Sequence, residues 1–160
     1  MKILLSIISI LLDIVFNNVF TSAVNSISYF YPMFTITSIV YLSNFYSNAN
    51  RKNYYVLILF VSIIYDSFVI NNLLISISLF ISIAIVNIKL KNYLANNLIN
   101  NFLRLILSII LYEILFNLLL VIIGYKMFDI HKIIYKVTHS LIINIFYLAL
   151  MFLVLKEKKS

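Results

Sequence analysis

Three acidic residues lie inside strongly apolar stretches of the chain and are the first candidates for chemistry. Asp13, Asp66 and Glu113 have runs of Ile, Leu, Val and Phe on both sides. A charged side chain at the centre of a bilayer costs at least about 2.5 kcal/mol on insertion scales, so each carboxyl group needs a partner or a function. Such groups can relay protons, bind cations, form a catalytic pair or hold helices together.

Polar neighbours recur at helical spacing around these acids. On helices, Ser6, Ser9 and Asn17 fall on the face of Asp13, Ser62 on that of Asp66, and Asn117 on that of Glu113. We expect these faces to point toward protein and to bond helices together, at about 0.6 kcal/mol per hydrogen bond. Docking of a partner helix and a proton or substrate pathway are the alternatives. The candidate helix or partner contacts are Asp13, Asn17, Ser62, Asp66, Glu113 and Asn117.

Catalytic and metal chemistry find little support in the residue types. The chain has no cysteine, and its two histidines are His131 and His139. Ser140 follows His139 directly, so on a helix the two side chains diverge by about 100° and cannot form a dyad. Asp13 and Asp66 lack the glycine motif of intramembrane aspartyl enzymes, and no glycine-rich phosphate loop exists. The sequence predicts a protein that is not an enzyme, with no catalytic residue, cofactor or metal.

The composition of the chain indicates whether water or lipid surrounds the folded protein. Of its 160 residues 64% are hydrophobic and 11% are charged, against about 25% charged in soluble domains. Too few polar groups exist to cover a surface in water, so we expect one all-α domain in lipid. The net charge is +7, and the basic residues lie between the apolar runs, where residues that set membrane orientation are found. The charge therefore does not indicate binding to nucleic acid.

Six apolar stretches approach the roughly 20 residues that a bilayer crossing needs. They are Ile3–Phe20, Ser28–Tyr46, Tyr54–Ile70, Leu73–Ile88, Phe102–Ile123 and Val137–Leu155. The third and fourth are short and predict a tight hairpin, with a re-entrant pair as the alternative. A cleaved signal peptide is the alternative for the first, although Asp13 interrupts its apolar core.

Basic residues set the orientation of these stretches. With the N-terminus inside, the inner segments hold Lys2, Arg51, Lys52, Lys89, Lys91, Arg104, Lys156, Lys158 and Lys159, and the outer segments hold Lys126, Lys132 and Lys136. This excess predicts that both termini lie in the cytoplasm of a bacterial inner membrane.

Two connectors carry their own expectations. Leu90, Tyr93, Leu94, Leu98 and Phe102 recur at helical spacing with asparagines between them, which predicts an amphipathic helix on the inner membrane surface. It would act as a linker or as a docking surface for a cytoplasmic partner. The connector 124–136 mixes apolar and charged residues and is expected to form a loop packed at the outer interface.

The stretch Leu57–Lys91, LILFVSIIYDSFVINNLLISISLFISIAIVNIKLK, resembles the MreD family of the bacterial rod-shape system. The family has an apolar helix ending in a glycine-containing element with an Asp, a short loop, and an apolar helix closed by basic residues. Ser62, Asp66, Asn71 and Lys89 with Lys91 take those places, and Ser62 and Asn71 stand where the family has glycine. Pro32 also lies where the family often has a proline.

The resemblance implies a non-enzymatic scaffold of the elongasome. It would bind the transmembrane helix of MreC and help to couple MreB filaments to RodA and its class B penicillin-binding protein, for peptidoglycan synthesis and cell shape. The alternative is the substrate-binding S component of an energy-coupling-factor vitamin transporter, whose six-helix fold is similar. Tyr125, Asp129 and His131 could then bind a ligand, although LLSIISILLDIVF lacks the alanines of that family's first helix.

Overall fold

Six α-helices make up most of the molecule, which is described by a computed structural model for residues 2–23, 31–46, 50–70, 75–125 and 127–156. The α-helices are α1 (Lys2–Ala23), α2 (Phe34–Leu42), α3 (Arg51–Tyr65), α4 (Ile75–Tyr93), α5 (Leu98–Ile122) and α6 (Ile130–Lys156). A 3-10 turn, η1 (Ser43–Phe45), extends α2, and a π-helical turn, η3 (Asp66–Ile70), extends α3. Within the described residues no strand occurs, which confirms the all-α prediction.

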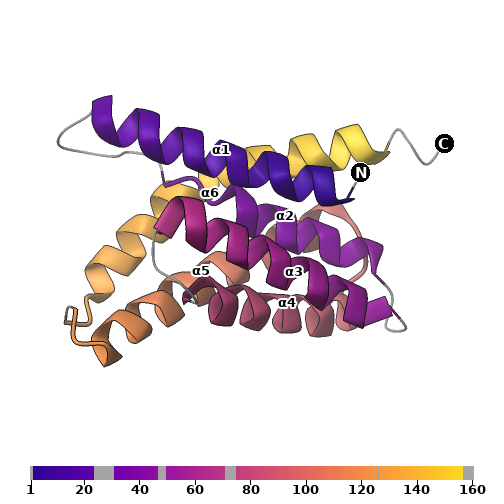
Figure 1. The fold of residues 1–160 in the computed structure, drawn as a ribbon. Helices are drawn as coiled ribbons and strands as arrows, with labels where there is room; N and C mark the ends of the chain where they lie inside the picture. The colour runs from indigo at the N-terminus through magenta and orange to yellow at the C-terminus, as the bar shows by residue number, and fades with distance from the viewer. Residues whose placement is uncertain (1, 24–30, 47–49, 71–74, 126, 157–160) are drawn as a thin grey trace.

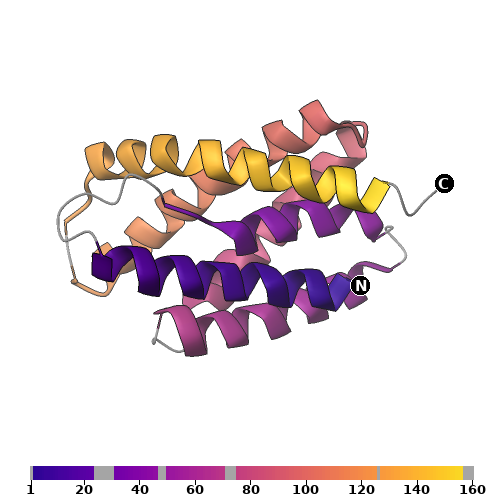
Figure 2. The same ribbon diagram turned by 90° about the horizontal axis from the view of Figure 1, so that it is seen from above.

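Successive helices run in opposite directions, so the N- and C-termini lie at the same end of the bundle (Figure 1). Seen from above, α1 and α6 lie on either side of α2 (Figure 2). Each odd-numbered helix packs most extensively against the even-numbered helix that follows it, and α2 also contacts α4, α5 and α6. The fold therefore consists of three helical hairpins, α1–α2, α3–α4 and α5–α6, and the short helix α2 of the first hairpin lies at the centre.

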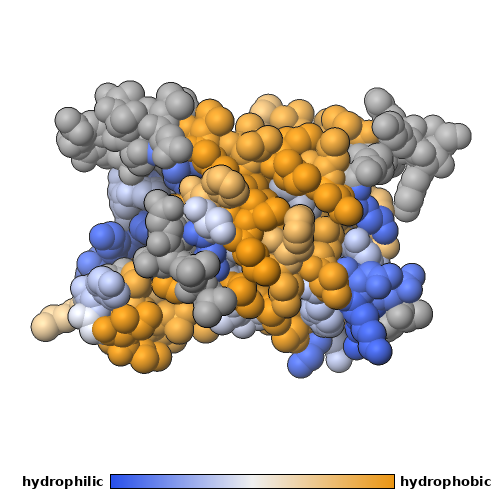
Figure 3. All heavy atoms as spheres, in the orientation of Figure 1, coloured by the Kyte–Doolittle hydropathy of each residue, from blue (hydrophilic) through white to orange (hydrophobic). Residues whose placement is uncertain are grey.

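Among the described residues, four helical segments are long and apolar enough to cross a membrane. They are Arg51–Val69, Ile75–Tyr93, Leu98–Ile122 and Ile130–Val154. The protein is therefore an α-helical, multi-pass membrane protein. An apolar band runs across the middle of the surface between more polar ends, as expected for a bundle embedded in lipid (Figure 3). Each arm of the α3–α4 hairpin, Arg51–Val69 (α3 with most of η3) and Ile75–Tyr93 (α4), reaches crossing length alone, which favours two crossings over the re-entrant alternative.

The second predicted span is wrong in length. Residues 28–30 lie outside the described residues, 31–33 are not helical, and helical structure continues only from Phe34 to Phe45. Twelve helical residues cover about 18 Å, well short of a hydrocarbon core of about 30 Å. Pro32 contributes because a proline disfavours helical geometry in the residue before it. All nine residues of α2 are buried, so this helix starts inside the bundle.

The predicted amphipathic helix between the fourth and fifth spans is wrong as well. The helix α4 continues to Tyr93 and α5 starts at Leu98, so only a short turn separates them. The Asn97 side chain accepts a hydrogen bond of 2.8 Å from the backbone N–H of Asn100 and caps α5. Asn97, one of the asparagines that suggested a polar helix face, instead starts α5, because a short amide side chain competes for backbone groups.

The far connector is shorter than predicted. Helix α6 begins at Ile130, so much of 124–136 is helical rather than loop. Gly124 has φ 82° and closes α5, where the N–H of Tyr125 donates to the carbonyl of Leu120 at 2.9 Å. This geometry is the usual glycine-ended helix terminus, and glycine adopts it without the strain that a side chain would cause.

Candidate functional site

The carboxylate of Asp13 binds the buried start of α2. Its two oxygens accept hydrogen bonds of 2.9 Å from the backbone N–H groups of Phe34 and Thr35, and the side chain is fully buried. Asn144 on α6 accepts from the N–H of Met33 at 3.0 Å and from the Thr37 hydroxyl at 3.1 Å. A helix that begins in the membrane interior needs such acceptors, because no water satisfies its first N–H groups.

The other end of α2 is held by lysines. Lys91 Nζ donates to the carbonyls of Ser43, Asn44 and Tyr46 at 3.2, 3.2 and 2.8 Å. Lys2 Nζ donates to the carbonyl of Phe45 at 3.3 Å and lies 4.2 Å from the ring centroid of Tyr46. Carbonyls at a helix C-terminus carry partial negative charge, so cations stabilise this end as the carboxylate stabilises the start.

Arg104 lies beneath these lysines. It is 1% exposed and donates through Nη1 to the Ser43 hydroxyl at 3.0 Å and through Nη2 to the side-chain oxygens of Asn44 and Asn101. From the sequence, we interpreted Lys2 and Arg104 only as charges that set the membrane orientation, and Lys91 also as a basic residue that closes the fourth apolar stretch. The position of Arg104 inside an apolar run, three residues after Asn101, was the signal that could have indicated a buried role.

Asp66 repeats the arrangement of Asp13 in the next hairpin. Both of its oxygens accept from the backbone N–H of Ser76 in the first turn of α4, at 3.0 and 3.2 Å. Ser62 is buried but bonds within its own helix, to the carbonyl of Ile58 at 2.7 Å. Asp66 therefore fastens α3 to α4.

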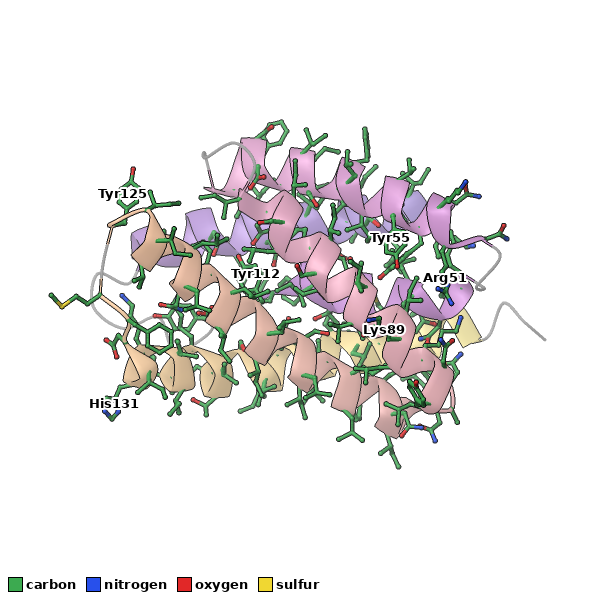
Figure 4. All side chains as sticks on the ribbon, turned by 90° about the horizontal axis from the view of Figure 1, so that it is seen from below. Arg51, Tyr55, Lys89, Tyr112, Tyr125 and His131 are labelled. Carbon is green, nitrogen blue, oxygen red and sulfur yellow. The ribbon has the colours of Figure 1, made fainter. Side chains whose placement is uncertain are left out.

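Glu113 provides the corresponding contact in the third hairpin. It is 1% exposed and its Oε1 lies 3.8 Å from Nζ of Lys136 on α6. Asn117 donates to the Glu113 carbonyl at 2.7 Å. Tyr112, labelled near the middle of Figure 4, packs against the ring of Phe80, with 6.2 Å between ring centroids, and Phe80 packs against Tyr65 at 5.0 Å. These ring contacts join α3, α4 and α5 beside Glu113.

The polar stripe of α1 faces protein, as expected, for its described buried members Ser6, Ser9 and Asp13. The Ser9 hydroxyl lies 2.8 Å from the Tyr147 hydroxyl on α6, which is a hydrogen bond between helices. Asn17 is half-buried. The other five candidate contact residues are at most 1% exposed, so they lie inside the bundle and not on a surface that an added helix could reach.

The described residues bring no metal-binding set together. Among them, no group of three or more His, Asp or Glu side chains is placed to hold a metal ion. His139 is half-buried and its Nδ1 lies 2.8 Å from the carbonyl of Tyr135 on its own helix.

The residues proposed for a transporter ligand are also dispersed. Tyr125 and His131 are exposed and lie apart at one end of the molecule (Figure 4). Asp129 accepts from the N–H of Lys132 at 3.1 Å and caps α6. The described buried polar groups therefore hold helices together by hydrogen bonds and an ion pair.

No protein-family model, curated protein or solved structure matches the chain. Its function must therefore be argued from its own residues.

Proposed function

We propose that this chain is a non-enzymatic scaffold of the bacterial rod-shape complex, with the role that its resemblance to MreD implies. In this proposal all six helices lie in the cytoplasmic membrane with both termini inside. The transmembrane helix of MreC is the direct partner, and MreB, RodA and the class B penicillin-binding protein are reached through the complex.

The use of Asp66 is the observation that supports this proposal most. The resemblance to MreD centres on the stretch around this acid, and in the structure the carboxylate fastens α3 to α4 through Ser76. A scaffold needs a fixed shape rather than a reactive group. The described buried acids all make contacts of that kind, because each one binds the helix that follows its own.

The outer surface supports the same proposal. The lipid-facing side of α1 exposes Ile3, Leu4, Ile7, Leu11 and Val15, and α6 exposes Ile142 at 72% and Phe146 at 65%. Helices in membranes associate through packing of such surfaces. The candidate partner surface therefore moves from the buried polar faces to these apolar ones.

Affinity purification from the native membrane in mild detergent tests the proposal. We expect mass spectrometry to find MreC with the tagged chain, and depletion of the chain to turn rod-shaped cells round. Co-purification of transporter ATPases, or a vitamin retained by the pure protein, would instead assign the chain to the energy-coupling-factor transporters.

Two tryptophan variants locate the partner surface. Leu11→Trp on α1 and Ile142→Trp on α6 both enlarge exposed apolar positions that lipid tolerates. We expect one variant to lose MreC and the other to keep it, with equal amounts of folded protein in the membrane. Retention of MreC by both variants would exclude these two faces.

A further inference from the structure

Three cations converge on one end of the short helix α2, where their described hydrogen-bond acceptors carry no full negative charge. Lys2, Lys91 and Arg104 all donate to Ser43, Asn44, Phe45 or Tyr46, and the acceptors are neutral oxygens. A helix C-terminus carries only about half of one negative charge. Within the part of the chain that the structure describes, the cluster of Lys2, Lys91 and Arg104, called the basic cluster here, therefore keeps most of its positive charge.

The described carboxylates are committed to other contacts. Asp13 binds the opposite end of α2, and Asp66 binds the first turn of α4, about 22 Å along that helix from Lys91. Glu113 pairs with Lys136, and Asp129 caps α6. Within the described residues, none of the contacts of the basic cluster is to a carboxylate. The remaining acid of the chain, Glu157, lies outside the described residues in a run of lysines.

Burial makes this imbalance costly. Arg104 is 1% exposed, and its Nε is buried without a hydrogen-bond partner. Lys91 and Arg104 are also close enough to repel each other electrostatically. Like charges repel more strongly in a low-dielectric interior than in water, so an added anion would stabilise the cluster.

The half-buried lysines give an anion from outside access to the cluster. Lys2 and Lys91 are only partly covered, whereas Arg104 lies below them. Ile3 and Leu4, which follow Lys2 directly, are 58% and 61% exposed. Apolar surface next to a cationic site suits a ligand that has both an anionic group and a hydrocarbon chain.

We propose that the basic cluster binds the phosphate of an anionic phospholipid headgroup. The phosphate contacts Lys2, while Lys91 and Arg104 add their charge from beside and below it, and the acyl chains lie on the exposed apolar side chains nearby. The lipid then completes the charge balance at the end of α2. This inference does not depend on the scaffold function.

Native mass spectrometry of the purified full chain, with titrated lipid, tests the inference. Phosphatidylglycerol should bind and raise the unfolding temperature, and phosphatidylcholine, whose headgroup has no net charge, should do neither. A basic residue near a membrane surface contributes about a fivefold change in binding, so Lys2→Gln should weaken phosphatidylglycerol binding about fivefold. Lys132→Gln, at the opposite end, removes the same charge and should leave binding unchanged.

The remaining outcomes separate the sources of the phosphate. Equal stabilisation by inorganic phosphate at the same concentration would overturn the lipid proposal in favour of a soluble phosphate ligand. Equal weakening by Lys2→Gln and Lys132→Gln would also overturn it, because binding would then follow net charge alone. Lys91→Arg keeps the charge and should retain binding. Loss of binding in this variant, with folding intact, would contradict the electrostatic role given to Lys91 and overturn the proposal.

Discussion

The carboxylate of Asp13 accepts a hydrogen bond of 2.9 Å from the backbone N–H of Phe34, 21 residues further along the chain. Met33, at the usual capping position of α2, makes no side-chain capping bond. The cap of α2 therefore comes from another helix, and one contact both satisfies a buried helix start and fixes the first hairpin. Asp66 and Ser76 make the same kind of contact in the second hairpin.

Replacement of Asp13 should destabilise the bundle strongly. Asp13→Ala leaves two buried N–H groups without acceptors, and each such group costs about 1–3 kcal/mol. We expect the free energy of unfolding in detergent to fall by about 2–4 kcal/mol. Asp13→Asn keeps one acceptor oxygen and should cost less. Asp129→Ala removes an exposed cap and is the control, with an expected loss of about 1 kcal/mol or less. Equal losses for Asp13→Ala and Asp129→Ala would contradict the role given to Asp13.

The hydrogen bond between Ser9 and Tyr147 should be measurable by a double-mutant cycle. The two hydroxyl oxygens lie 2.8 Å apart and join α1 to α6. From unfolding of Ser9→Ala, Tyr147→Phe and the double variant, we expect a coupling energy of about 0.6 kcal/mol. Additive effects of the two changes would show that the hydroxyl groups do not interact.

The pair of Glu113 and Lys136 should show an asymmetry between single and double variants. Lys136→Met leaves a carboxylate that is 1% exposed without this cation. Removal of one partner of a buried pair costs more than replacement of both by neutral groups. We expect Lys136→Met to lower the unfolding temperature more than the double variant Glu113→Gln with Lys136→Met. The reverse order would show that the pair does not balance charge in the bundle.

Single cysteines should report the orientation of the bundle, because the chain has no cysteine of its own. Tyr93, the last residue of α4, is 87% exposed, and Met127 is 89% exposed in the connector before α6. In intact cells, a membrane-impermeant maleimide should label Met127→Cys and should label Tyr93→Cys only after permeabilisation. The opposite pattern would invert the proposed topology.

Composition and periodicity were sufficient to predict an all-helical membrane protein. The long runs of Ile, Leu and Val could only be buried in lipid or in a bundle, and the spacing of Ser6, Ser9 and Asp13 predicted a face that points inward. These properties depend on local sequence, so no knowledge of the neighbouring helices was needed.

The tertiary structure alone decided where the polar groups bind. Nothing near Asp13 in the sequence indicates Phe34 as its partner. Likewise, the sequence around Arg104 predicts a charge that sets the membrane orientation, whereas in the structure Arg104 donates a hydrogen bond to Ser43. The length of α2 depended on acceptors from α1 and α6, because a buried helix start is stable only where other helices satisfy its N–H groups. The sequence alone determined which residues could not face lipid, and the packing of the helices determined what each of them holds.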